Sequence, residues 1–173
     1  MEISAIYQKL YEFVVAATGY ASDKVIFANQ STPRPSKPFI MIDVQSLRNV
    51  GKPIVKLVDE EGVQETTVSM LFTASFQAFS DLLHEAEDVL STLHIKFSTE
   101  LQNDIFQGEL AALKTLRNVS AIPEELNEQI ESRAILDMEM SFNKATKHEV
   151  GLIEEVHFLN EINNKQYVIK KGE

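Results

Sequence analysis

Several residue types and patterns are missing from this 173-residue chain, and each absence excludes a class of protein. There is no cysteine, which excludes disulfide bonds, thiolate metal sites and cysteine-based catalysis. No apolar run approaches the roughly 20 residues that a membrane-spanning helix needs. The opening M-E-I-S-A lacks the basic region of a secretion signal. With 44% hydrophobic residues, the composition predicts a soluble folded protein that stays inside a cell.

Motifs that carry enzyme chemistry are missing as well. The chain has no Gly-x-Ser-x-Gly elbow, no phosphate-binding glycine loop, no His-Glu-x-x-His and no dinucleotide fingerprint. Six glycines are few for an active site built on loops. Adjacent acidic pairs such as Glu60-Glu61 are poor acid–base partners, because neighbouring side chains of a strand point apart. We therefore expect no enzyme, no cofactor and no bound metal.

The net charge of −10 is unevenly distributed along the chain. Residues 1–58 carry seven Lys/Arg against four Asp/Glu, whereas residues 59–140 carry four against seventeen and residues 141–173 carry five of each. The acidic middle is either a solvated surface or a face that meets the basic N-terminal part of another copy. Nucleic-acid affinity depends on clustered cations, so specific DNA binding is not expected.

Two long stretches alternate apolar and polar residues with the two-residue period of a half-buried strand. Thr66–Ala78 and Ile130–Phe142 each place six apolar side chains on one face. Such strands belong in an antiparallel sheet whose apolar face is covered by helices. The apolar residues of the two faces are Val68, Met70, Phe72, Ala74, Phe76 and Ala78, and Ile130, Ala134, Leu136, Met138, Met140 and Phe142.

Helical spacing predicts the covering layer. Residues 2–18 have apolar side chains at helical intervals, with Gly19 placed to end the helix. A second helix is expected to begin at Ser80, and a third after the capping box at Thr99–Gln102, ending near Gly108. The fold class is therefore α+β, a mainly antiparallel twisted sheet with two to three helices packed on one face. We expect a single domain, with residues 1–143 as its core and 144–173 as a C-terminal β-hairpin or arm.

The remaining segments are predicted from turn residues and short apolar runs. Val25–Ala28 and Phe39–Leu47 are expected to be strands, and Asn49–Pro53 a turn before a short strand at Ile54–Val58. Asp59–Gly62 is typical of a hairpin loop, and Ile122–Leu126 of a turn or a single helical turn. Residues 109–119 fit either a helix or a strand. Two further strand-like pieces, Ile153–Ile162 and Gln166–Lys170, lie in the tail.

A proline-rich segment at residues 29–38, N-Q-S-T-P-R-P-S-K-P, joins two of these strands. Its prolines fix φ and remove backbone donors, so the segment is extended but cannot be an inner strand. It is either a stiff surface connection or, through Pro35-Ser-Lys-Pro38, a PxxP ligand for an aromatic groove.

The stretch V-I-F-A-N-Q-S-T-P-R-P-S-K-P-F-I-M-I-D, residues 25–43, resembles the opening of the phage neck or tail terminator proteins. In that family a short apolar strand runs into Asn-Gln, Pro-Arg-Pro, a further proline and a second strand. E-S-R-A-I-L-D-M, residues 131–138, resembles a late strand of the same family. The resemblance covers roughly residues 20–160 and favours a strand by about Lys114.

The resemblance implies a non-enzymatic structural virion protein. Members of the family form a ring, usually of six copies, that terminates the tail tube and joins it to the head-side connector or neck protein. DNA then passes through the lumen without specific binding, and the protein belongs to the virion tail or neck after assembly in the host cytoplasm. Candidate contacts with other subunits are Asn29, Gln30, Pro33, Arg34, Pro35 and Lys37, with Arg133 as an ion-pair partner or a cross-strand partner within the sheet.

An alternative class stays open, a small intracellular enzyme or ligand-binding α+β domain with a pocket between helices and sheet. The predicted second helix places Asp81, His84, Glu85 and Asp88 on one face, at spacings that can share a metal ion. A solvated polar face explains the same residues, and no other predicted helix offers matching ligands. The sequence leaves the tail type, the face that meets the tube, the channel-lining charges and the oligomeric state of the free protein open.

Overall fold

The computed structural model describes residues 1–31, 33–56, 62–122, 124–126, 129–150, 155–160 and 165–170. The chain divides into two compact units. The first unit combines Met1–Lys52 with Val68–Lys144, and the second combines Pro53–Thr67 with Ala145–Glu173. Three long strands, β2 (Phe39–Val55), β3 (Val63–Ser80) and β6 (Gln129–Glu149), contribute residues to both units, and the candidate site lies in the first.

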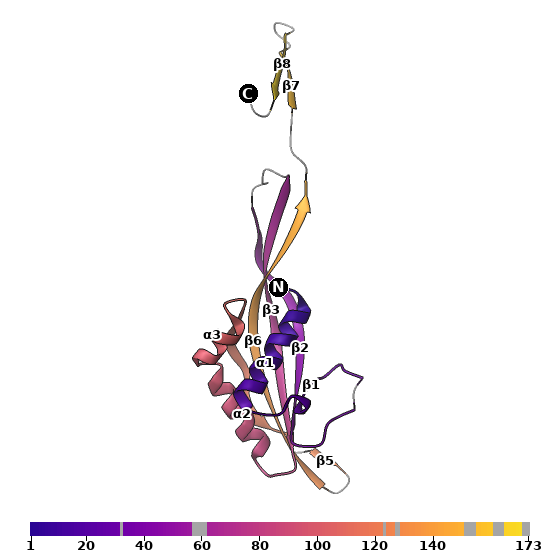
Figure 1. The fold of residues 1–173 in the computed structure, drawn as a ribbon, viewed down its shortest axis with the longest axis vertical. Coiled ribbons are helices and arrows are strands. Elements are labelled where there is room, and N and C mark those ends of the chain that lie inside the picture. Colours follow the sequence, from indigo (N-terminus) through magenta and orange to yellow (C-terminus); the bar gives the residue numbers. More distant parts are fainter. Residues whose placement is uncertain are drawn as a thin grey trace. The chain divides into compact units, whose positions relative to one another are not determined.

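A mostly antiparallel sheet with the strand order β1-β2-β3-β6-β4 is the framework (Figure 1). β1 runs parallel to β2 and pairs with it from Ile40 to Ile42, whereas β4 and β5 run antiparallel to β6. Together with the helices, this sheet confirms the predicted α+β class. The strands are β1 (Val25–Phe27), β2 (Phe39–Val55), β3 (Val63–Ser80), β4 (Leu110–Ala121), β5 (Glu124–Leu126) and β6 (Gln129–Glu149).

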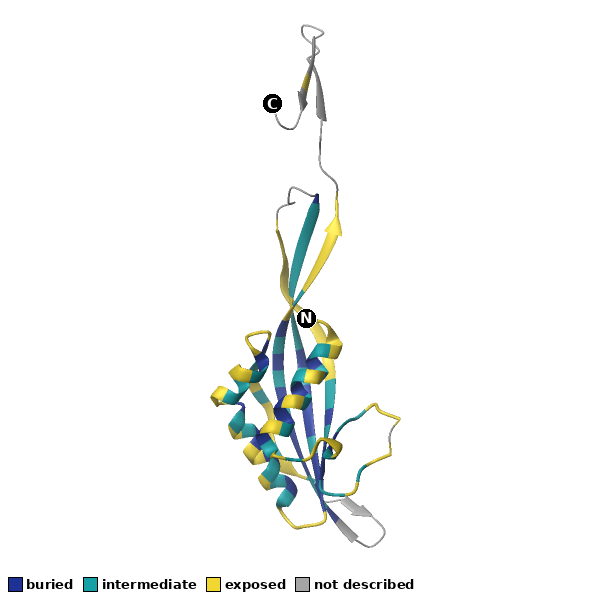
Figure 2. Ribbon diagram, viewed as in Figure 1, coloured by how far each residue is buried: buried dark blue, intermediate teal, exposed yellow. Residues whose placement is uncertain are grey.

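Three helices enclose the core against one face of the sheet, and Figure 2 shows the buried residues concentrated between these layers. The helices are α1 (Ile3–Thr18), α2 (Glu85–Lys96) and α3 (Glu100–Phe106), with a 3-10 turn, η1 (Ser22–Lys24), before β1. The ring of Phe13 on α1 lies 4.4 Å from Phe97, at the end of α2, and 5.1 Å from Phe106 on α3, between ring centroids. The aromatic side chains thus join all three helices.

The alternating patterns of the two long strands are confirmed. On the predicted faces, β3 buries Phe72, Ala74, Phe76 and Ala78, with Val68 and Met70 half-buried, and β6 buries Ala134, Leu136, Met138, Met140 and Phe142. On the opposite faces, Phe79 of β3 and Glu131 and Ile135 of β6 are buried as well. The side chain of Ile130, assigned to the same face, lies outside the described residues. Burial of roughly 1.5–3 kcal/mol per large apolar side chain makes this face the main source of stability.

The first helix ends as its sequence predicts. Gly19 adopts the left-handed conformation (φ 70°) and donates its backbone N–H to the carbonyl of Val15 at 2.9 Å. This conformation is strained for residues with a Cβ atom, which is why glycine is favoured there. The chain then turns through η1 into β1, as the run Val25–Ala28 predicts.

The second helix begins later than predicted. β3 continues to Ser80, and α2 starts only at Glu85, so Leu82 and Leu83 do not join the buried stripe but are strongly exposed. His84 takes a left-handed conformation (φ 65°) immediately before the helix. Ala86, Leu90 and Leu93 are buried, because they lie within the helix that does form.

Three other segments differ from the sequence prediction. β2 runs without a break through the predicted turn Asn49–Pro53, and Gly51 absorbs the irregular backbone there with φ 76°. β4 is a strand, which settles the ambiguity of residues 109–119, and β5 replaces the turn expected within Ile122–Leu126. α3 does follow Thr99, although the Thr99 hydroxyl donates to the Lys96 carbonyl at 2.8 Å instead of capping α3.

The second unit contains the tail strands. β7 (Glu155–Asn160) pairs antiparallel with β8 (Lys165–Lys170), close to the two strand-like pieces predicted there.

Another part of the second unit contains an ion pair. Glu65 accepts a hydrogen bond from the ammonium of Lys56 at 2.7 Å, which lowers the pKa of this carboxyl group. The predicted loop Asp59–Gly62 falls outside the described residues except for Gly62.

A candidate subunit interface at the proline-rich segment

The proline-rich segment, residues 29–38, is attached to the first unit at both of its ends. Near its start, the backbone N–H of Gln30 donates to the carbonyl of Phe27 at 3.4 Å. Near its end, the ammonium of Lys24 donates to both the carbonyl and the hydroxyl of Ser36, at 2.6 and 2.7 Å. Three prolines already restrict the backbone between these two attachments.

Lys37 connects this segment to two other elements. Its ammonium lies 2.6 Å from a carboxylate oxygen of Glu131 on β6 and 3.0 Å from one of Asp81, which follows β3. Glu131 is a buried carboxylate, so it needs a charged partner to offset its desolvation. The hydrogen bond to Glu131, and then that to Asp81, raises the pKa of Lys37 above its ordinary value.

Phe79 forms the centre of the surrounding cluster. Its ring stacks on that of Phe39, with 4.6 Å between the centroids and 11° between the planes. The guanidinium groups of Arg34 and Arg133 lie 5.6 and 5.2 Å from the centroid of the same ring. Each is within the distance at which a cation is attracted to an aromatic face. Arg133 also donates to the amide oxygen of Gln77 on β3 at 2.7 Å.

The predicted contact residues therefore lie in one region but differ in what they present to solvent. Arg34, Lys37 and Arg133 meet around Phe79 and Glu131, and Arg133 forms a cross-strand bond inside the sheet. Pro35 and Lys37 are half-buried, as is Arg133. The exposed members, which are available to another molecule, are Asn29, Gln30, Pro33 and Arg34.

Sequence reasoning missed two members of this cluster, Phe79 and Glu131. Phe79 carried a signal, because it is an aromatic residue on the face of β3 that its nearest neighbours, Thr73, Ser75 and Gln77, make polar. Glu131 and Arg133 are two residues apart on one strand and so share a face. Their partners from the proline-rich segment carry no such signal, since that contact depends on the tertiary fold.

The acidic face proposed for the second helix does not gather into one site. The carboxylate of Asp81 pairs with Lys37, that of Glu85 accepts from the hydroxyl of Ser80, and the ring of His84 meets Glu87 at 2.8 Å. Because α2 starts at Glu85, Asp81 and His84 are not on the helix. Within the described residues, no group of three or more His, Asp or Glu side chains is arranged to hold a metal.

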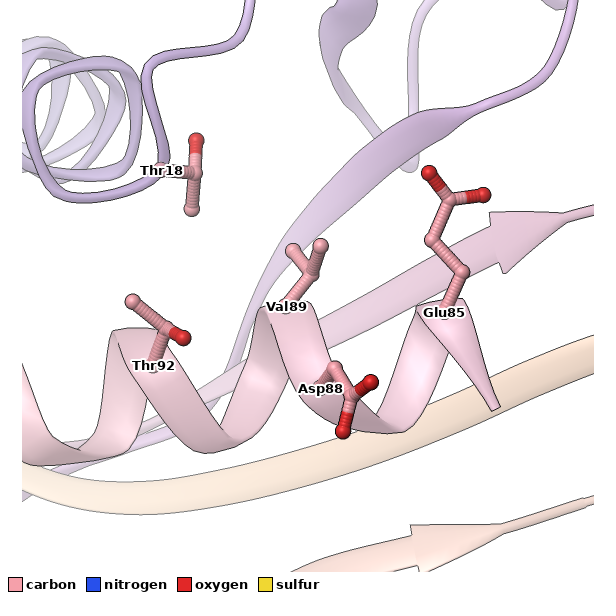
Figure 3. Close-up of a pocket in the computed structure, with 5 residues that line it drawn as sticks. All are labelled: Thr18, Glu85, Asp88, Val89 and Thr92. Carbon is pink, nitrogen blue, oxygen red and sulfur yellow. The ribbon is translucent and has the colours of Figure 1, made fainter. Parts of the chain in front are cut away.

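The hollow between α1 and α2 is small. It measures about 160 Å³ and is lined by Glu85, Asp88, Val89 and Thr92 of α2 with Thr18 across from them at the end of α1 (Figure 3). Pockets for small ligands usually measure about 300–1,000 Å³. Among the described residues, no helix is both long and apolar enough to cross a membrane.

Comparison with known proteins gives one family. Residues 4–171 match the sequence model of the family described as phage neck terminator protein. The match spans nearly the whole chain and includes the proline-rich segment and the long strands. No curated protein matches the chain.

Proposed function

Because this chain belongs to the phage neck terminator proteins, we propose that it forms a ring, of six copies, which closes the tail tube and joins it to the head-side connector. The family places the protein in the neck of the virion as a structural component. The match over residues 4–171 is the observation that carries this proposal. Its partners are then further copies of itself, the tail tube protein and the connector or neck protein, after assembly in the host cytoplasm.

The exposed part of the proline-rich segment is suited to a contact between copies. Asn29, Gln30, Pro33 and Arg34 offer amide, apolar and cationic groups on a backbone that is already restrained. Restrained segments lose less conformational entropy on binding. Lys37 holds the segment on the sheet through its ion pair with Glu131, and Arg133 donates to Gln77 within the sheet.

The charge distribution supports a ring of unlike contacts. A heterologous contact that closes on itself joins two different surfaces of the chain, and opposite charges favour that pairing. The region before residue 59 is basic and residues 59–140 are strongly acidic. Acidic residues that line the lumen would repel DNA phosphates, so the genome passes without adhering. Acidic positions found only on the outer rim would remove this part of the proposal.

The decisive experiment is the absolute mass in solution by light scattering, with and without assembled tail tubes, combined with electron microscopy of the tube ends. We expect a mass of about six times 19.5 kDa, or a ring that forms only on tube ends. A chain that stays monomeric and ignores the tubes would contradict the proposal.

A further inference from the structure

The turn between β3 and α2 presents two leucines to solvent. Leu82 is 66% exposed and Leu83 is 78% exposed. Polar groups on both sides hold the turn: the hydroxyl of Ser80 accepts from the Leu82 N–H at 3.0 Å, and the ring of His84 meets Glu87 at 2.8 Å. The turn is therefore fixed before it meets a partner, which lowers the entropy lost on binding.

A shallow hollow adjoins this turn. It measures about 210 Å³, and its lining includes Leu83, His84 and Glu87 on one side and Ala121 and Arg133 on the other. Glu131, which anchors Lys37, also contributes to the lining. The hollow and the two leucines thus form one surface next to the proline-rich segment. We refer to Asp81–His84 with this hollow as the leucine turn.

A second exposed apolar surface lies on β2. Every residue from Gln45 to Lys52 is exposed, which is unusual for a strand of a helix-covered sheet. Leu47 is 42% exposed and Val50 is 40% exposed. β1 covers the outer edge of β2 at Ile40 to Ile42, and in the described sheet no further strand follows β2 on that side.

The two surfaces carry opposite charges. The stretch Ser80–Asp88 contains four carboxylates and no Lys or Arg, whereas Gln45–Lys52 contains Arg48 and Lys52 and no Asp or Glu. Leu82 and Leu83 accompany the carboxylates, and Val50 shares the strand face of Arg48. Complementary charge and apolar area are the features that select and hold a protein partner. Because the surfaces differ, a contact between them is heterologous and can be repeated from copy to copy.

We infer that the leucine turn of one copy packs against the exposed β2 segment Gln45–Lys52 of the next copy. Leu82 and Leu83 cover Val50, and the carboxylates around α2 face Lys52 and Arg48, which also pairs with Glu139 of its own chain. This contact deepens the proposed function, since it rests on a ring of copies and names two surfaces that meet in it. It lies outside the predicted contact residues of the proline-rich segment.

The cysteine-free chain allows a direct test by disulfide trapping. Two single-cysteine variants, Leu83→Cys and Val50→Cys, are purified separately, mixed and oxidised gently, and the products are separated without reductant. We expect a band at about twice 19.5 kDa from the mixture and its loss when either variant is oxidised alone. The matched control replaces Leu83→Cys with Ile95→Cys, which lies on α2 and is 67% exposed.

The mass of the mixture, measured before oxidation, separates this inference from the proposed ring. If the mixture has the mass of a ring but Ile95→Cys forms the disulfide with Val50→Cys as efficiently as Leu83→Cys does, the contact is overturned and the ring is not. Strong trapping of Leu83→Cys with itself would overturn it too, because the contact would then join like surfaces. A monomer with and without tail tubes would overturn both.

Discussion

The ammonium of Lys37 lies 2.6 Å from the carboxylate of Glu131, a residue that is only 7% exposed. Lys37 belongs to the proline-rich segment and Glu131 to the sheet strand β6. The same ammonium reaches Asp81 at 3.0 Å, just before the leucine turn. One side chain thus connects the segment, the sheet and the turn, so the two surfaces proposed to meet other copies are fixed to each other.

Replacing Lys37 is expected to destabilise the fold. Lys37→Met leaves the buried carboxylate of Glu131 without its charged partner, and we expect a loss of about 1–2 kcal/mol because a bond to a charged group is removed at a partly exposed site. The urea unfolding midpoint measures this. Lys52→Met, an exposed lysine on β2, is the control and should change stability by less than about 0.5 kcal/mol. Equal midpoints for both variants would contradict the anchoring role.

The same pair predicts an alkaline dependence. Since Glu131 and Asp81 raise the pKa of Lys37 above its ordinary 10.5, its contribution is complete below the unfolded-chain pKa. It disappears as the pH rises through the higher folded pKa. The melting temperatures of wild type and Lys37→Met should therefore differ at neutral pH and converge above the folded pKa, provided that the fold survives there. A constant difference across that range would argue against the ion pair.

Glu139 predicts an acid dependence on the polar face of the sheet. Lys114 at 3.2 Å and Arg48 at 2.9 Å lower the pKa of its carboxyl group, with the hydrogen bond from Lys114 as the larger cause. The stabilisation is present above the unfolded pKa and is lost as the pH falls through the folded one. The melting temperature of Glu139→Gln should thus fall less than that of wild type between pH 7 and strong acid. Asp88→Asn is the control. If the melting temperature of Glu139→Gln fell as much in acid as that of wild type, Glu139 would not be the source of the acid dependence.

The left-handed end of α1 predicts an ordered series at Gly19. Among the described residues, no neighbouring atom lies within 4 Å of the position that a Cβ of residue 19 would occupy. A substitution therefore costs only the free energy of backbone strain. Gly19→Ala should cost roughly 1–2 kcal/mol, and Gly19→Asn less, because asparagine tolerates the left-handed region. Thermal unfolding of the two variants checks the order. If Gly19→Asn were less stable than Gly19→Ala, the left-handed φ would not be what determines the cost of substitution.

The core predicts a large effect at Phe76. Its side chain is fully buried, and its ring centroid lies 5.6 Å from that of Phe97 at the end of α2. Phe76→Ala should cost about 3–5 kcal/mol, the usual range when a buried aromatic leaves a cavity. Leu82→Ala, at an exposed apolar position, should change stability by less than about 0.5 kcal/mol. Comparable losses in chemical unfolding would mean that Leu82 is buried in the free chain.

We expect a substitution of Arg34 to impair assembly much more than folding stability. Arg34→Glu removes a cation–π contact with Phe79, a loss of about 0.5–1 kcal/mol at an exposed site, and reverses a charge on the proposed contact. Light scattering should show a loss of the assembled mass while the unfolding midpoint falls only slightly. Lys96→Glu, on α2, is the charge-matched control. Unchanged assembly in Arg34→Glu would exclude the segment as a contact between copies.

The sequence was sufficient where one physical signal dominated. The alternation in β3 and β6 sets their buried faces, because only a two-residue period places six apolar groups together. Gly19 marked the end of α1 for an equally local reason. These features fix the α+β class and the layer that carries the site.

Local signals failed where they conflicted. Ser80 and Asp81 resemble a helix start and Leu82 and Leu83 fit a helical stripe, yet β3 continues to Ser80 and a left-handed His84 delays α2. A positive φ is uncommon for any residue except glycine, histidine included, so the sequence favoured an ordinary helix start here. The leucines of β4, Leu110, Leu113 and Leu116, have helical spacing, yet the segment is a strand because it pairs with β6. The bond between Lys37 and Glu131 depends on which elements meet in space, which no local pattern contains.

The irregular pairing of β4 has a consequence for aggregation. β4 is an outer strand of the sheet, and its register with β6 shifts three times between Ala112 and Ser120. Such bulges twist an edge, and Lys114 and Arg117 add charge along it, so the strand is a poor template for fibril growth. The outer edge of β4 is therefore protected against the growth of continuous intermolecular sheets.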